Sequence, residues 1–129
     1  MIEIKNIYKK FGKLEVLNDV NLSFKKGECI ALIGPNGCGK TTLIKSILGM
    51  VIPSKGDILF NEKSILKEFK YREQIGYMPQ IGRYPDYMTV GQIIEMIKKI
   101  RNSDQVLDED LVHAFQLEKI VDKQMRTLS

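Results

Sequence analysis

The residues best suited to chemistry lie in one glycine-rich segment, Gly34-Pro35-Asn36-Gly37-Cys38-Gly39-Lys40-Thr41. The segment fits the pattern G-x-x-x-x-G-K-[ST] at every defined position. Gly37 and Gly39 let backbone N–H groups turn toward phosphate oxygens where a β-carbon would interfere. The Lys40 ammonium can reach the β- and γ-phosphates of a nucleotide, and the Thr41 hydroxyl can coordinate Mg²⁺. The segment therefore predicts a site for a nucleoside triphosphate with Mg²⁺.

Three further residues complete the predicted phosphate-binding set. Asn36 and Cys38 belong to the loop itself, and the Thr42 hydroxyl would lie near the α-phosphate. Cys38 also allows a second interpretation, because a helix N-terminus and Lys40 would both favour a reactive thiolate. The alternative, which we favour, is that this position accepts any small residue.

The elements beside this segment have the order that such a site requires. Residues 29–33 form a short, uninterrupted apolar run, which predicts a central strand buried on both faces. After the loop, apolar residues recur at helical spacing until Gly49, which predicts a helix over residues 43–48. A strand before the loop and a helix after it form the context that this motif needs.

Other strands are predicted on both sides of this core. Residues 2–4 and 20–24 alternate between apolar and polar side chains, so each predicts a half-buried strand. Residues 58–60 predict a further strand that ends at Asn61, and residues 76–80 predict a short strand that runs into a loop.

The second part of the chain is predicted to be helical. Thr89 and Gln92 form a capping box that opens a helix with one apolar face. Ser103 and Asp104 can cap a second helix. The residues expected to face inward are Val90, Ile93, Ile94, Ile97 and Ile100 of the first helix and Leu107, Leu111 and Phe115 of the second.

Composition excludes several classes of protein. The 129 residues are 43% hydrophobic with a net charge of +4, which fits one soluble domain and excludes disorder. No apolar run approaches the roughly 18 residues of a membrane helix. Two cysteines form no disulfide framework and suit a reducing cytosol. The excess of basic residues lies in residues 1–83 and suits a polyphosphate ligand, although solvated surface lysines explain much of it. No nucleic-acid partner is expected, because no basic stripe is interleaved with aromatic residues.

Beyond the loop, the motifs together resemble the ATP-binding subunits of ABC transporters. Residues 20–43 resemble the family's approach to its P-loop, Ile75–Gln80 its Q-loop and Met88–Val90 the start of its helical subdomain. Arg126–Ser129 resembles the approach to its signature motif, Leu-Ser-Gly-Gly-Gln. The resemblance follows the family's order along the whole chain.

This resemblance implies an α/β fold. It implies a P-loop NTPase core with an N-terminal antiparallel β region and the start of an α-helical subdomain, as an incomplete domain. Residues 1–83 would form the nucleotide-binding core and residues 84–129 the partial helical subdomain.

The resemblance also implies roles for individual residues. Phe11 matches the aromatic residue that stacks on adenine, and Val16 would line the same surface. Tyr8 is the rival for the stacking role, and Phe11 could instead simply be packed at a strand end. Gln80 would bind Mg²⁺ or orient the attacking water and relay the nucleotide state to a membrane partner; the alternative is a glutamine without a role.

Residues just after the Q-loop resemblance have two interpretations. Tyr84, Tyr87 and Met88 match the region that faces the membrane subunit, so an exposed patch there would be a docking surface. Packing beneath the loop is nearly as plausible an interpretation.

Several parts of the family's catalytic machinery are not recognisable in these residues. The signature motif stops at Ser129, and no Walker B strand, catalytic glutamate or switch histidine is found. Residues 106–109 imitate a Walker B motif, but only two apolar residues precede the acids and the segment comes before the signature. His113 is expected to be a solvated or packed side chain.

The resemblance implies an ABC-type ATPase that couples ATP binding and hydrolysis to substrate movement through a transmembrane permease subunit. It would lie on the inner face of the cell membrane and pair with a second nucleotide-binding domain, identical or different. The chain alone is expected to bind nucleotide weakly, without turnover, and to associate. Alternatives are a soluble ABC ATPase without transport and a truncated nucleotide-sensing module. Residues 82–85 and 124–127 further resemble subunits of copper-site maturation for nitrous oxide reductase.

Overall fold

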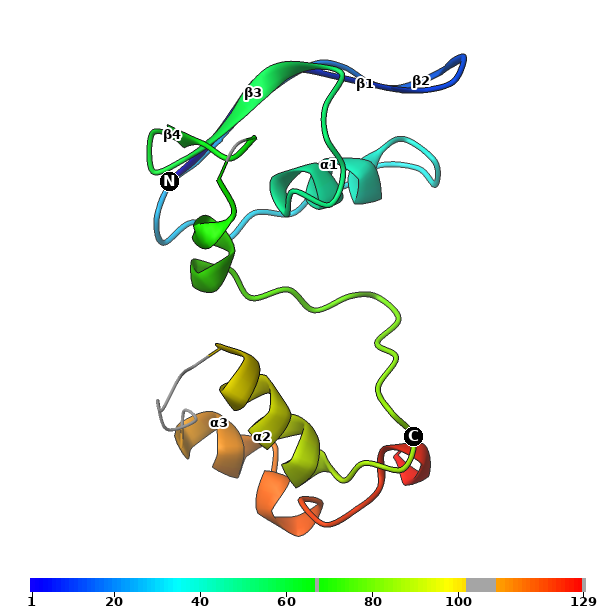
Figure 1. Cartoon of the computed structure of the whole chain (residues 1–129), viewed down its shortest axis with the longest axis vertical. Helices are drawn as coiled ribbons and strands as arrows, with labels where there is room; N and C mark the ends of the chain where they lie inside the picture. Colours follow the sequence, from blue (N-terminus) through cyan, green and yellow to red (C-terminus); the bar gives the residue numbers. More distant parts are fainter. Residues whose placement is uncertain (67, 102–108, 129) are drawn as a thin grey trace. The chain divides into compact units, whose positions relative to one another are not determined.

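The computed structural model describes residues 1–66, 68–101 and 109–128, the side chain of Glu109 excepted. It divides into two units, Met1–Gly76 and Tyr77–Ser129 (Figure 1). Within the described ranges, no helix is both long enough and apolar enough to cross a membrane.

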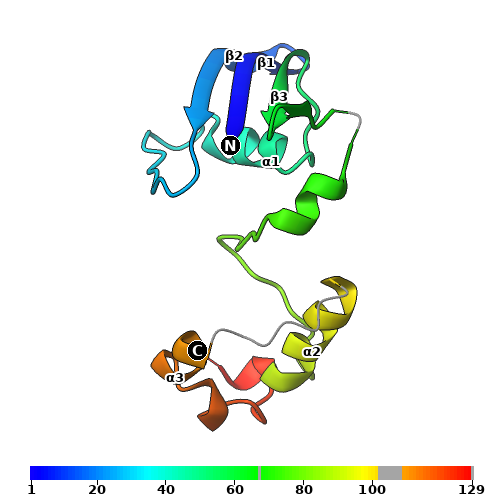
Figure 2. The ribbon, with the colours of Figure 1, turned by 90° about the vertical axis from the view of Figure 1, so that its left-hand side faces the viewer.

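The first unit is built on an antiparallel sheet with the strand order β2-β1-β3-β4. The strands are β1 (Ile2–Phe11), β2 (Leu14–Phe24), β3 (Lys55–Phe60) and β4 (Lys63–Ser64). Helix α1 (Lys40–Ile47) covers one face of this sheet (Figure 2). The core between them contains Ile4, Ile7, Leu17, Leu43, Ile58, Ile65 and Tyr71. The predicted strands at residues 2–4, 20–24 and 58–60 are confirmed, and the first two are much longer than their alternation indicated.

Helix α1 ends as the sequence predicts. Gly49 has φ +67°, and the backbone N–H groups of Gly49 and Met50 donate to the carbonyls of Ser46 and Lys45. This is the pattern of a Schellman motif. The following 3₁₀ helix, η1 (Lys70–Gln74), adds side-chain donors at the same end of α1.

Two predicted strands are absent from the described structure. Residues 29–33 form no strand, and Ile33 is 90% exposed. The physical reason is pairing: an apolar strand is stable in an interior only when neighbouring strands accept and donate its backbone hydrogen bonds, and no described segment pairs with residues 29–33. The prediction of a strand at residues 76–80 is wrong for the same reason.

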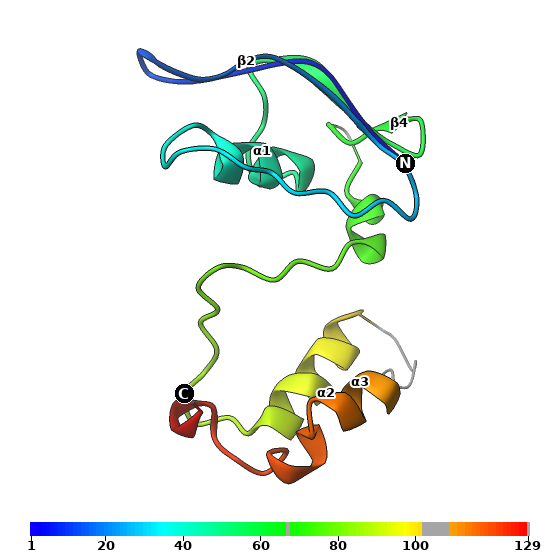
Figure 3. The ribbon, with the colours of Figure 1, turned by 180° about the vertical axis from the view of Figure 1, so that it is seen from behind.

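The second unit is helical, with α2 (Val90–Arg101), α3 (Glu109–Ala114) and two 3₁₀ helices, η2 (Leu117–Lys119) and η3 (Met125–Thr127). Thr89 and Gln92 form the predicted capping box: the Thr89 N–H donates to Gln92 Oε1 at 2.9 Å, and the Gln92 N–H donates to Thr89 Oγ1 at 3.2 Å. Figure 3 shows α2 and α3 of this unit from behind.

The apolar faces of these helices are only partly buried. Ile93 is buried, but Ile100 at the other end of α2 is 74% exposed. The first turn of α2 contacts Val121, and in its last turn Lys98 is half-buried whereas Ile100 is exposed. Leu111 on α3 and Phe115 directly after it are exposed, so the prediction that they face inward is wrong. Val112 of α3 is half-buried. Ser103, Asp104 and Leu107 lie outside the described residues.

Candidate nucleotide site

The loop of residues 34–39 leads directly into α1, which begins at Lys40. Gly39 has φ +97°, and a β-carbon there would lie 2.8 Å from Val16 O and 3.0 Å from Leu17 Cδ2. No side chain fits between the loop and β2 at this position. Gly37 also has a left-handed backbone, with φ +83°, although the space beside it is open. Both glycines are therefore needed for the path of the loop, as their spacing predicts.

The Lys40 side chain folds back over the loop. Its ammonium donates to Gly34 O at 2.6 Å and to Pro35 O at 2.7 Å, so the positive charge lies within the curve of the backbone. Among the described residues, no group accepts a hydrogen bond from the backbone N–H groups of Lys40, Thr41 or Thr42. An ammonium beside free N–H groups at a helix N-terminus is an arrangement suited to a phosphate group.

Cys38 lies on the inner side of the loop. Its sulfur is 3.8 Å from Lys40 Nζ and would be 2.8 Å from a β-carbon on Gly34. The residue is exposed and its thiol is free. The favoured interpretation, that this position accepts any small residue, stays a prediction, as does the alternative of a reactive thiol.

The donor set fits a magnesium ion that arrives with a nucleotide. Thr41 is exposed and Thr42 half-buried, and Asn36 lies exposed in the loop. Within the ranges that the structure describes, no three His, Cys, Asp or Glu residues gather at one place. Mg²⁺ is commonly held by a few protein oxygens, substrate phosphates and water, so a threonine hydroxyl beside a phosphate cradle suits it.

The tip of the β1–β2 hairpin carries the residues predicted for the base. Phe11 pairs with Leu14 at the end of β1. The residue is 49% exposed, and Lys9 Nζ lies 5.0 Å from the centroid of its ring. Val16 lies against the loop, and its Cγ1 would be 3.3 Å from a β-carbon placed on Gly39. Burial, and then the Asp19 carboxylate, raise the pKa of the half-buried Tyr8. The structure thus brings Val16 to the P-loop and leaves Phe11 about half exposed, with the Lys9 ammonium over one face of its ring.

Comparison with known proteins identifies this arrangement. The family model described as ABC transporter matches residues 17–129. The chain belongs to the ABC transporter family.

Similar members of this family are ATP-binding proteins of transport systems. The chain is 35% identical to the sulfate/thiosulfate import ATP-binding protein CysA of Pectobacterium atrosepticum, over 99% of the chain and 41% of that protein. It is 43% identical to the spermidine/putrescine import ATP-binding protein PotA of Clostridium novyi, over 78% of the chain and 30% of that protein. The chain thus spans less than half the length of these relatives.

Solved structures place the fold in the same family. The structure of an ATP binding subunit of an ABC transporter matches with a TM-score of 0.86 and 27% identity, over 99% of this chain and 55% of that one. A nucleotide-free ATP-binding cassette from an ABC transporter matches with a TM-score of 0.77 and 26% identity, over 99% and 58%. The antiparallel β region with its few helices is part of a P-loop NTPase domain, as predicted.

The remaining residues suggested by the ABC resemblance belong to the second unit. Gln80 is exposed in an irregular segment after the half-buried Pro79. Tyr84 and Tyr87 are exposed and Met88 is half-buried, and the Arg126 guanidinium lies 5.7 Å from the centroid of the Tyr87 ring. An accessible aromatic pair therefore follows the Q-loop resemblance.

Two segments that the sequence analysis discussed have other outcomes. His113 is solvated, as expected, and its Nδ1 lies 2.7 Å from Glu118 Oε1. Ser129 and residues 106–108 lie outside the described residues.

Sequence reasoning missed a polar cluster on the hairpin that carries Phe11 and Val16. Asn6 and Asn21 both donate side-chain hydrogen bonds to Asp19 Oδ1, at 2.9 and 3.1 Å. These bonds, the one from Asn6 first, lower the pKa of Asp19, whereas desolvation opposes them. One signal was present in the sequence. Ile4 and Ile7 are both apolar and both buried although they are three positions apart, whereas residues on one face of a regular strand are an even number of positions apart.

Proposed function

We propose that this chain is the ATP-binding part of an ABC transporter ATPase that takes Mg²⁺ and ATP. Lys40 would bind the β- and γ-phosphates, and Thr41 would hold the Mg²⁺ that comes with them. The observation that carries the proposal is the Lys40 ammonium beside unbonded N–H groups at the start of α1. A bound triphosphate would replace the Gly34 and Pro35 carbonyls as the partner of this ammonium.

The remaining contacts follow from the positions of the side chains. Phe11 would stack on adenine and Val16 would line the same surface, which agrees with the exposed ring and with the contact of Val16 at Gly39. The loop residues Asn36, Gly37, Cys38 and Gly39 and the hydroxyl of Thr42 would surround the phosphates.

Gln80 would connect the nucleotide to a membrane partner. Its amide oxygen is a ligand type that suits Mg²⁺, or it could orient the attacking water. The exposed side chains of Tyr84 and Tyr87 would then belong to the surface that meets a transmembrane permease subunit. The whole protein would act at the inner face of the cell membrane, paired with a second nucleotide-binding domain. Its similarity to import ATP-binding proteins favours transport over a soluble role.

Turnover requires more than these residues supply. Transfer of a phosphoryl group to water needs a positioned water and a base as well as a phosphate cradle. No Walker B carboxylate is recognisable in the 129 residues. We therefore expect the chain to bind ATP weakly and to release no phosphate.

The test is to measure ATP binding by equilibrium dialysis and phosphate release in the same samples, with Mg²⁺ present. Saturable binding without phosphate release above the buffer rate is expected. Phosphate release that disappears in Lys40→Ala would contradict the inactivity of this chain, and the absence of ATP binding would contradict the whole proposal.

Partner choice needs a separate experiment. The tagged protein should be purified from gently solubilised membranes of its source cells and from the ribosome fraction. Co-purification with a polytopic membrane subunit is expected, and recovery with ribosomes alone would favour a soluble ABC ATPase.

A further inference from the structure

In the β1–β2 hairpin, the spacing of the inward-facing residues is irregular on both strands. On β1, Ile4 and Ile7 are both buried although they are three positions apart. On β2, Leu17 belongs to the same core as Val20, again three positions away. Residues an odd number of positions apart point to opposite faces of a regular strand, so each strand must contain an extra residue.

These extra residues form two β-bulges, one on each strand, and the pairing shifts a third time nearer the hairpin tip, between Lys9 and Lys10 of β1. In the first, Asn6 is the additional residue of β1 and lies opposite Asn21. In the second, Asp19 is the additional residue of β2 and lies opposite Tyr8. Asn6 and Asp19 both have φ 48°, in the left-handed region that Asn and Asp enter more readily than other side chains do. The residue types therefore match the backbone at both bulges.

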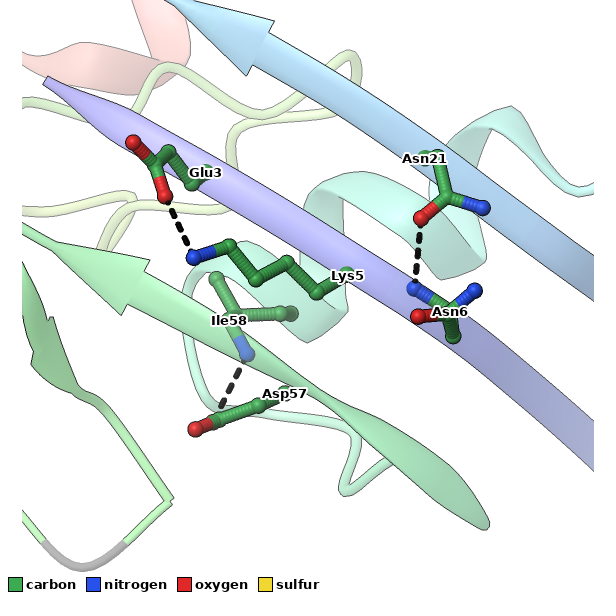
Figure 4. Close-up of polar contacts among 6 residues, drawn as sticks. All are labelled: Glu3, Lys5, Asn6, Asn21, Asp57 and Ile58. Carbon is green, nitrogen blue, oxygen red and sulfur yellow. Dashed lines mark hydrogen bonds and ion pairs between the residues drawn. The ribbon is translucent and has the colours of Figure 1, made fainter.

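Three side chains, which we call the Asp19 network, join the two bulges. Asn6 Nδ2 and Asn21 Nδ2 both donate to the Oδ1 atom of Asp19. The Asn6 N–H donates to Asn21 Oδ1 at 2.8 Å, a bond that Figure 4 shows between β1 and β2. Asn21 Nδ2 also reaches the Asp19 carbonyl at 3.0 Å. Because one carboxylate oxygen accepts from both Asn6 and Asn21, its removal would leave, of these side-chain bonds to Asp19, only the one from Asn21 Nδ2 to the Asp19 carbonyl.

The neighbouring strand is shaped to receive the first bulge. Gly56 of β3 has φ +88°, and a β-carbon there would collide with the carbonyls of Asn6 and Lys5. Lys5 itself turns away from the network and pairs with Glu3 at 2.8 Å (Figure 4). The bulge is thus accommodated on both sides of β1.

The second bulge determines which residues of β2 meet the P-loop. Val16 O and Leu17 Cδ2 are the two atoms closest to a β-carbon on Gly39. A slip of one residue would exchange the faces of the side chains beyond Asp19, so Leu17 would leave the core and Val16 would move relative to Gly39. Phe11 lies at the tip of the same hairpin, on the same side of the bulges as Val16. The phosphate-binding residues 34–42 lie outside the hairpin.

On the basis of the proposed function, we infer that Asp19 is a positioning residue for the base of the nucleotide. By joining the two bulges, it fixes the register in which Phe11 and Val16 are presented to adenine. Asp19 lies outside the phosphate-binding residues 34–42, so we expect its effect to be larger on the part of the ligand that carries the base than on the phosphates.

The test compares two ligands on the 129-residue chain by isothermal titration calorimetry. ATP reports on base and phosphates together, whereas inorganic tripolyphosphate has no base and reports on the P-loop alone. Asp19→Ala removes the acceptor and places alanine at a left-handed backbone position. Asp19→Asn is the matched control, because its amide oxygen can still accept from Asn6 and Asn21 and asparagine tolerates φ 48°.

Asp19→Ala is expected to weaken ATP binding about tenfold, the scale of one lost base–aromatic contact, while tripolyphosphate affinity changes by less than about twofold. Asp19→Asn is expected to keep both affinities. An equal loss for both ligands in Asp19→Ala would overturn the inference and leave Asp19 a general stabiliser of the fold. Unchanged affinities in Asp19→Ala would overturn it as well.

Two further outcomes keep the experiment decisive. If Asp19→Ala loses its cooperative thermal transition, Asn21→Ala replaces it, since that change removes a donor and leaves the left-handed residues in place. The same selective loss of ATP affinity is then expected in Asn21→Ala. An equal loss of affinity for ATP and tripolyphosphate, or no loss for either, would overturn the inference. A wild-type chain that binds neither ligand would contradict the proposed function, and the inference would fall with it.

Discussion

Asp19 illustrates how one exposed carboxylate can affect a strand without belonging to the core. Its Oδ1 atom accepts hydrogen bonds from both Asn6 and Asn21. The ionised carboxylate, which only accepts hydrogen bonds, is the form best suited to this arrangement. The same bonds lower the pKa of Asp19 from its ordinary value of 3.8. The network therefore makes stability depend on pH in a defined direction.

A group whose pKa is lower in the folded state stabilises the fold above its unfolded pKa, and this contribution disappears as the pH falls through the folded value. We expect the difference in free energy of unfolding between wild type and Asp19→Asn to stay constant above about pH 5 and to decrease below pH 3.8. Urea unfolding between pH 3 and 7, followed by circular dichroism, measures this difference. A difference that is independent of pH over this range would show that the carboxylate charge is not used.

At the scale of elements, the two ends of α1 have different tasks. Its N-terminus keeps N–H groups unbonded, whereas its C-terminus is closed by the 3₁₀ helix η1. Tyr71 OH donates to Ile47 O at 3.1 Å and Arg72 Nη2 donates to Gly49 O at 3.0 Å. Gly49 makes this approach possible, because a β-carbon there would lie 2.5 Å from Arg72 Nη2 and 2.6 Å from Tyr71 OH.

Gly49→Ala should therefore cost more stability than a positive φ alone explains. Gly27→Ala is the matched control, since Gly27 has φ +85° with no atom within 4 Å of the added carbon. Both variants carry the strain of a left-handed alanine, about 1–2 kcal/mol. Gly49→Ala should lose about 1 kcal/mol more, the scale of one displaced hydrogen bond. Equal free energies of unfolding for the two variants in urea would contradict this account of the α1–η1 contact.

Local patterns predicted the elements that depend mainly on nearby residues. The Thr89–Gln92 capping box, the stop of α1 at Gly49 and the strands of the hairpin all follow from short-range spacing. The glycine-rich loop is likewise recognisable because its backbone must adopt left-handed angles at Gly37 and Gly39. For these features, composition and spacing contain the physical requirement itself.

Features that depend on distant partners could not be predicted in this way. Residues 29–33 are apolar enough for a buried strand, but pairing decides whether a strand forms, and no described segment pairs with them. Leu111 and Phe115 have helical spacing, yet spacing does not specify which face another element covers. The spacing of Ile4 and Ile7 indicates an irregular strand, but the Asp19 network joins residues of two strands, so its hydrogen bonds depend on a register that the sequence does not specify.

At the scale of the whole molecule, the two units contain different parts of the proposed machinery. The first holds the phosphate loop and the hairpin for the base, and the second holds Gln80 and the exposed Tyr84 and Tyr87. In the second unit, α2, α3 and η2 surround an apolar hollow lined by Gly91, Ile94, Glu95, Lys98, Val112, Leu117, Glu118 and Val121. Because the residues proposed to bind the phosphates and the base belong to the first unit, we expect ATP affinity to depend mainly on that unit.

The most direct test of the central claim is a calorimetric titration of the chain with ATP in the presence of Mg²⁺, comparing wild type, Lys40→Ala and Lys45→Ala. Lys45 is the control because it is an exposed lysine in the last turn of the same helix. Loss of one charged contact to phosphate is expected to weaken binding at least about tenfold in Lys40→Ala, while wild type and Lys45→Ala bind alike. Equal affinities for all three proteins, or no binding by wild type, would contradict the assignment of residues 34–41 as the nucleotide site.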